Sequence, residues 1–436
     1  MRRLPVPLLL VAAAAAVGAC RGSGDATAAA GWQTVIDTVG DTLVVRTVGA
    51  SDSAALLRLV PELRIGEFEG AEEYQFANVG FVLPAPGDGV YVWDWTLTSL
   101  RQYDSAGTFV RRIGGKGGGP GEFGAANGIV LLRDGRLVLW DPRNTRLNVY
   151  DSAGASVASW RFPSGLHVGG FGGLLVDTAD NVYAMHWFAP TDTTRQALPG
   201  ERSGYMVLGP DGVVRDSVLP PPIAAPSATI VASREGGTSS SGVPFAAQRS
   251  WTVSPFGYVV GGVGDRYAIT LFRPGAPLRI ERDAAPVPVD PDEKADAEER
   301  AIANMRMTDP SWRWNGPPIP DDKPLFSAIR VAADGRIWVQ RSRPGVRVEP
   351  DTTGDGARAA GDPRLRMPPR RWREPMAYDV FEPDGRYVGF LPVPERTRLL
   401  HMRGDRAWGA ETDSLDVPYV VRFRITKAGT PGGTPE

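Results

Sequence analysis

Two aspartates stand at the same place in two similar stretches of the sequence. Asp94 and Asp141 each end a short apolar run, each follow a tryptophan, and lie 47 residues apart. Weaker copies of this stretch carry other residues at the same position, namely His186, a glycine (Gly261 or Gly262), Arg341 and Glu411. Carboxylates bind Ca²⁺, imidazoles bind Zn²⁺ and guanidinium groups bind anions. If the fold brings these positions together, they could form a ligand or metal site.

A structural role competes with this chemistry. An aspartate at the end of a strand can accept hydrogen bonds from backbone N–H groups in the loop that follows. This role is favoured for Asp94 and Asp141, which share the recurrent Trp-Asp pattern. The residues that depart from the pattern, His186, Arg341 and Glu411, are the ones that could be released for ligand contacts. For each of these three residues, a side chain that is hydrogen-bonded within the protein is a more frequent arrangement than one that contacts a ligand.

Metal sites gain little support from spacing. His167, His186 and His401 are the three histidines of the chain and stand at dissimilar places in the pattern, whereas a three-histidine zinc site needs them all within about 2.1 Å of one ion. An oxygen-ligand site could combine Asp94, Asp141 and Glu411, but no spacing indicates it, and no Ser-His-Asp arrangement is recognisable. We therefore expect no cofactor; Ca²⁺ or Zn²⁺ would belong only to an alternative in which the protein is an enzyme.

The spacing of 47 residues belongs to a repeat. The sequence Tyr-Asp-Ser-Ala-Gly occupies residues 103–107 and returns at 150–154, and its Asp and Gly are typical of a turn between antiparallel strands. Similar apolar runs and Gly-containing turns recur in weaker form up to residue 425, which makes six units in total. Units of this length with four strands each are typical of β-propellers. The sequence therefore predicts an all-β protein, a six-bladed β-propeller.

Such a ring has to close, because open terminal blades would expose strand edges. Residues 64–66 (Arg-Ile-Gly) repeat residues 112–114, which are expected to end the outer strand of the first blade. We therefore expect an N-terminal strand to form the outer strand of the last blade. The chain is predicted to begin with a signal peptide (1–19) and a flexible tether (20–31). An N-terminal β segment (32–60), the propeller (61–429) and a disordered tail (430–436) follow.

Two motifs resemble NHL-repeat proteins. Residues 141–147 (DPRNTRL) match the D-x-x-N-x-R-hydrophobic phrase of these repeats, and residues 114–123 (GGKGGGPGEF) look like their connector. The chain as a whole resembles bacterial six-bladed propeller lipoproteins of unassigned function. Because NHL-like propellers include scaffolds, ligand binders and a few enzymes, the resemblance implies a fold and little about function.

Long insertions are expected on one face of the propeller. In each blade, the loop between the second and third strands and the connector to the next blade emerge on the same face, which we call the top face. The four longest insertions are of these two kinds and cover residues 190–203, 222–249, 284–325 and 342–375. Loop growth confined to one face of a rigid scaffold is typical of a binding face.

The third insertion is predicted to contain a short helix. Asp290 can cap its N-terminus, Pro291 suits its first turn, and Asp309-Pro310 would end it. If the helix is a lid over the central channel, Trp312 and Trp314 become contact residues; the alternative is a helix packed on the surface. The fourth insertion carries arginines that could hold an anion or could line a solvated loop, namely Arg364, Arg366, Arg370, Arg371 and Arg373.

The N-terminus predicts export and lipid anchoring. Two arginines precede an apolar stretch that is too short to span a bilayer, and Val17-Gly18-Ala19-Cys20 resembles a lipobox whose cysteine, the single one in the chain, is lipidated. Residue 21 is Arg rather than the Asp associated with inner-membrane retention, which favours the outer membrane. The net charge of −2 gives no reason to expect nucleic-acid binding.

These observations lead to one preferred function and one alternative. The preferred interpretation is a monomeric propeller, lipid-anchored at the cell envelope, that faces the periplasm or the cell surface. It would bind a small molecule or an envelope protein through its top face. The alternative is a metal-assisted hydrolase or lyase, similar to lactonase or NHL-type propellers, with its site at the channel mouth. The question of catalysis stays open and leans towards none, and no catalytic or metal-binding residue is assigned.

Overall fold

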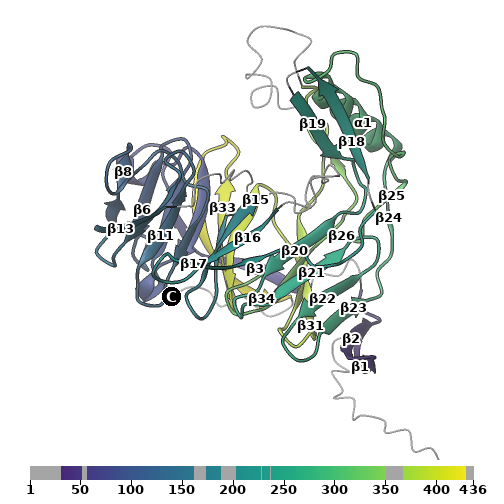
Figure 1. Ribbon diagram of the computed structural model, residues 1–436, viewed down its shortest axis with the longest axis horizontal. Coiled ribbons are helices and arrows are strands. Elements are labelled where there is room, and N and C mark those ends of the chain that lie inside the picture. Colours follow the sequence, from purple (N-terminus) through teal and green to yellow (C-terminus); the bar gives the residue numbers. More distant parts are fainter. Residues whose placement is uncertain are drawn as a thin grey trace, which may run out of the picture.

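The computed structural model describes residues 31–51, 56–161, 173–187, 203–226, 228–235, 237–349 and 367–428. Within these ranges strands make up most of the regular secondary structure, and six sheets are arranged as the predicted six-bladed β-propeller (Figure 1). Contacts between the first strands of neighbouring blades, such as β4 with β10 and β20 with β26, place that strand at the centre of the ring. We call the strands of a blade A to D, from the centre outward.

The first three blades follow each other along the chain. Blade 1 consists of β4 (Val79–Pro84), β5 (Val90–Asp94), β6 (Ser99–Tyr103) and β7 (Phe109–Ile113). Blade 2 consists of β10 (Ile129–Leu131), β11 (Leu137–Asp141), β12 (Arg146–Tyr150) and β13 (Ser156–Arg161). Blade 3 consists of β14 (Leu174–Val176), β15 (Val182–Trp187), β16 (Ser203–Leu208) and β17 (Val214–Val218).

The other three blades include the closure of the ring. Blade 4 contains β20 (Arg249–Val253), β21 (Val259–Val263), β22 (Ala268–Phe272) and β23 (Leu278–Arg282). Blade 5 consists of β26 (Phe326–Val331), β27 (Ile337–Arg341), β30 (Ala377–Phe381) and β31 (Tyr387–Pro392). Blade 6 consists of β32 (Thr397–Arg403), β33 (Arg406–Thr412), β34 (Pro418–Lys427) and β3 (Leu57–Ile65). Because β3 pairs antiparallel with β34, the N-terminal strand closes the last blade, as predicted.

The N-terminal hairpin has a place that the sequence did not indicate. Strands β1 (Gln33–Val39) and β2 (Thr42–Val48) extend blade 4 to six strands, and β2 runs parallel to β23 (Figure 1). This covers the outer edge of β23, which would otherwise expose unpaired backbone groups. The exposed edge moves to β1, whose residues are nearly all exposed to solvent.

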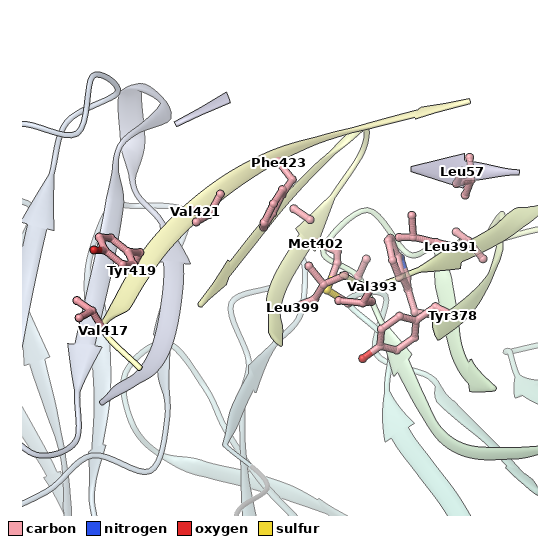
Figure 2. Close-up of a cluster of buried hydrophobic side chains, with 14 residues drawn as sticks. Leu57, Tyr378, Leu391, Val393, Leu399, Met402, Val417, Tyr419, Val421 and Phe423 are labelled. Carbon is pink, nitrogen blue, oxygen red and sulfur yellow. The ribbon is translucent and has the colours of Figure 1, made fainter. Parts of the chain in front are cut away.

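The cores lie between blades. All five residues of β5 and all five of β11 are buried, since both faces of a blade pack against neighbours. Figure 2 shows one such core, where Tyr378 and Leu391 of blade 5 meet Leu399 and Phe423 of blade 6. Leu57 of β3 packs in the same cluster, so the closing strand also contributes apolar burial, the main stabilising term in folding.

The repeated Tyr-Asp-Ser-Ala-Gly segments form the C–D turns of blades 1 and 2. In the first copy, Asp104 accepts hydrogen bonds from the N–H groups of Ala106 and Thr108 at 2.9 and 2.8 Å, and Asp151 does the same in the second copy. Gly107 and Gly154 both have φ +84°, a conformation that disfavours other residues. These turns lie on the face opposite to the insertions.

The top face carries the remaining elements. The insertions form β18 (Thr229–Arg234), β19 (Gly237–Gly242), β24 (Val287–Pro288), β25 (Asp322–Lys323), β28 (Val346–Arg347), β29 (Trp372–Arg373) and the helix α1 (Pro291–Arg306). Shorter pieces on this face are β8 (Gly115–Lys116), β9 (Glu122–Phe123) and the 3₁₀ turn η1 (Glu72–Tyr74), whereas the 3₁₀ turn η2 (Pro86–Asp88) forms the A–B turn of blade 1 on the opposite face. As Figure 1 shows, β18, β19 and α1 stand away from the blades as a projection. Asp290 caps α1 by accepting from the N–H of Asp292, as predicted.

Candidate functional site

Asp94 and Asp141 are buried, and their oxygens bind backbone N–H groups of their own blades. Asp94 is 1% exposed and accepts from Ala77, Asn78 and Leu97 at 2.7, 3.0 and 2.9 Å. Asp141 is 0% exposed and accepts from the N–H groups of two connector residues, Gly124 and Ala125, and from Asn144. Each aspartate therefore ties the connector that enters its blade to the B–C loop, which is the structural role.

His186 and Glu411 are the penultimate residues of their B strands, β15 and β33. His186 is 9% exposed, and burial lowers the pKa of its imidazole, which favours the neutral form. Glu411 is partly exposed, with the Arg64 guanidinium 3.9 Å from its carboxylate. The two side chains belong to blades 3 and 6.

Arg341 lies in a buried polar cluster between blades 4 and 5. Its Nη1 donates to Asp379 at 2.9 Å, and Asp379 also accepts from the hydroxyls of Tyr267 and Tyr387, both at 2.8 Å. Arg282, from the end of β23, stands 3.5 Å from the same carboxylate and donates to the carbonyl of Ser51. Burial and the negative charge of Asp379 raise the pKa of Tyr267 well above its usual value. The cluster joins two blades and the N-terminal segment.

The predicted contact residues Trp312 and Trp314 belong to the core of the projection. Trp312 is 4% exposed, and its Nε1 donates to the carbonyl of Val231 on β18. Trp314 packs on the same cluster, in an edge-to-face contact with Trp312. Met305 of α1 and Ile230 of β18 are fully buried there. The second and third insertions thus fold together into one unit, and α1 is a packed helix.

A buried lysine connects this projection to blade 5. The ammonium group of Lys323 is bonded to Glu293 of α1 at 2.6 Å, to Glu374 at 3.1 Å and to the carbonyl of Arg343 at 3.0 Å. Burial raises the pKa of Glu374, and the neighbouring Glu293 adds to this shift. The sequence does not indicate this cluster, because its members come from two separate insertions, at 284–325 and 342–375, and meet only in the folded chain.

Several predicted features fall outside the described residues. They are the lipidation site Cys20, most of the insertion at 190–203, the C-terminal tail, His167, Arg364 and Arg366. Of the arginine tract, Arg370, Arg371 and Arg373 are described, and Arg370 is exposed. Arg371 forms ion pairs with Asp296 and Glu299 of α1, and Arg373 forms one with Glu395.

A pocket of about 240 Å³ opens on the top face at blade 1. Its polar lining comes from Ser99 and Arg101 of strand C and from Arg112 of strand D. The connector that enters the blade contributes Glu72 and Gln75. The apolar part of the lining is Phe76, Ala77 and Leu97. No sequence prediction placed a site here, although one signal was available: blade 1 breaks the D-x-x-N-x-R phrase by carrying Leu97 and Ser99.

The described part of the chain holds no group of three or more His, Cys, Asp or Glu residues placed to share a metal ion. It also contains no helix of the length and apolarity that a membrane span requires.

Solved structures share the fold of this chain. No family model and no curated protein matches the sequence. A member of the DUF4221 family from Bacteroides vulgatus is similar with a TM-score of 0.51 and 10% identity over 86% of this chain and 99% of that one. A Bacteroides fragilis protein described as exported gives 0.45 and 11% over 88% and 100%, and virginiamycin B lyase from Staphylococcus aureus gives 0.38 and 9% over 84% and 99%. At these identities the similarity establishes the propeller fold alone.

Proposed function

We propose that this protein is a binding propeller at the cell envelope, anchored through lipidated Cys20, which uses its top face to bind a small ligand or an envelope protein. One observation carries the proposal. The second and third insertions fold together into a projection with its own buried core on the face where the other long insertions also emerge. Drift of surface loops would not build a packed unit on one face and leave minimal turns on the other.

The apolar residues exposed on the two faces provide a direct test. Phe68, Met307 and Leu415 are exposed in top-face segments, at 64%, 52% and 73%, whereas Val213 and Phe256 are exposed in bottom turns, at 51% and 49%. A photo-crosslinking amino acid at each position, in intact cells, should yield adducts from the top positions only. Adducts from the bottom positions, or equal adducts from both faces, would overturn the proposal.

The anchor is tested separately. Cys20→Ser should move the protein from the membrane fraction to the soluble fraction while its crosslinking pattern stays confined to the top face. Membrane association that survives this substitution contradicts lipid anchoring at Cys20.

The hydrolase or lyase alternative is less well supported by the described residues. Two of the three carboxylates that it would need, Asp94 and Asp141, already accept several backbone hydrogen bonds in separate blades. Withdrawing them to bind a metal would remove these hydrogen bonds and release the connectors that the two buried carboxylates hold, which would destabilise the fold.

A further inference from the structure

The pocket at blade 1 holds polar groups that are buried and have bonding capacity left. Arg101 is 1% exposed and uses Nη1 to donate to the carbonyls of Glu73 and Gln75, at 3.1 and 2.8 Å. Its Nε and the hydroxyl of Ser99 are buried and have no hydrogen-bond partner among the described residues. Such groups are costly to bury, and a ligand that enters the pocket can satisfy them.

The equivalent space in blade 2 is filled. Arg146, 47 residues after Ser99, extends along the connector and donates to the carbonyls of Gly119 and Glu122, at 2.6 and 2.7 Å. Those two positions correspond to Glu72 and Gln75, which line the pocket in blade 1. The Nε of Arg146 also lacks a partner. The two blades therefore differ in that blade 1 has an open space beside Arg101. This space exists because blade 1 has the small Ser99 where blade 2 has Arg146.

The charges around this space favour an anion. Arg101 and Arg112 both line it, whereas the equivalent positions in blade 2 carry Asn148 and Ser159. Two acidic groups are near. Asp94 already accepts three backbone hydrogen bonds, and Glu72 pairs with Arg112 at 2.9 Å with a side chain that is 79% exposed. An exposed pair of this kind is weak, so Arg112 can turn to an anion in the pocket.

We propose that this pocket binds a small carboxylic acid with an apolar body. A planar carboxylate matches the geometry of an arginine side chain and can also accept from the Ser99 hydroxyl. Phe76, Ala77 and Leu97 provide an apolar wall for the rest of the molecule. The volume of about 240 Å³ is below the roughly 300–1,000 Å³ typical of pockets for drug-sized ligands, which indicates a compact acid. The proposal deepens the proposed top-face function and rests on it.

Benzoate is a suitable probe, with benzamide as its uncharged counterpart and inorganic phosphate as a rounder anion. Ligand-observed NMR on the purified mature chain should show saturable benzoate binding, at least tenfold tighter than benzamide or phosphate. Ser99→Met fills the space and keeps both arginines, and Arg101→Asn keeps the space and removes one charge; each should weaken benzoate binding at least tenfold. Arg146→Ser is the matched control, which changes the equivalent site of blade 2 and should leave benzoate binding unchanged.

Three results would overturn the proposal: no saturable benzoate binding, equal binding by the wild type and the Ser99→Met variant, or phosphate binding as tightly as benzoate. Failure here is distinguishable from failure of the proposed function. The crosslinking experiment reports on the top face in cells and does not depend on benzoate.

Discussion

Blades 1 and 2 are the most similar pair in the chain, and they differ where a ligand could enter. Both have a buried aspartate that binds the incoming connector, and both have the same turn on the bottom face. In blade 2, Arg146 donates to the connector carbonyls. In blade 1 the equivalent of Arg146 is Ser99, and the connector carbonyls are bound instead by Arg101, two residues later on strand C. The small Ser99 leaves a pocket. One exchange of a large residue for a small one can thus replace a structural contact with an open pocket.

The largest expected effect tests whether the buried aspartates of blades 1 and 2 have the same structural role. Asp94→Ala and Asp141→Ala each remove a buried acceptor of several backbone N–H groups, which should lower the free energy of unfolding by about 3 kcal/mol. Urea denaturation of the two variants should give losses that agree within about 1 kcal/mol. If Asp94→Ala lowers the free energy of unfolding much less than Asp141→Ala does, the two aspartates do not share the same structural role.

The next effect concerns the arginine that holds each connector. Arg146→Ser and Arg101→Asn each remove bonds to two carbonyls, and each should lower the free energy of unfolding by about 2 kcal/mol. Arg146→Ser also opens a space in blade 2, but without the two arginines of blade 1. Denaturation and benzoate titration of both variants separate stability from binding. If Arg146→Ser creates a benzoate site, the open space matters more than the charge.

A smaller effect is expected at the bottom turns, where the blades are alike. Asp104→Ala and Asp151→Ala each remove a side chain that caps its own turn on the exposed surface, so each should cost about 1 kcal/mol. Thermal unfolding should show equal shifts, and benzoate binding should be unchanged in both. Loss of binding in Asp104→Ala would show that the pocket depends on the far face of blade 1.

The smallest change in stability is expected when blade 1 is rebuilt as blade 2. In the double variant Ser99→Arg/Arg101→Asn, the new arginine can reach the carbonyls of Glu72 and Gln75, as Arg146 reaches their counterparts. The free energy of unfolding should stay within about 1 kcal/mol of the wild type, in contrast to Arg101→Asn alone. Denaturation of the single and double variants measures this rescue; a double variant as unstable as the single one contradicts the equivalence of the blades.

The repeats predicted much of the fold because their spacing depends on interactions between residues that are close in sequence. The spacing of Trp-Asp and of the Gly-containing turns depends on strand length and turn geometry, which neighbouring residues determine. For this reason the six blades, the closing strand β3 and the helix α1 were all predicted correctly. Other parts depend on partners far away in the chain. Trp312, expected as a contact residue if α1 formed a lid, is buried against β18, because the second and third insertions pack on each other.

The sequence alone was enough to predict the number of blades and the face on which the insertions emerge. It also favoured a structural role for Asp94 and Asp141, as acceptors of backbone hydrogen bonds. These depend on periods and turns that can be counted along the chain. The tertiary structure decided that Arg341 binds Asp379, that Lys323 joins the projection to blade 5, and that Ser99 leaves a pocket. Each of these depends on which side chains occupy a space between segments distant in sequence, and a linear pattern does not contain that information.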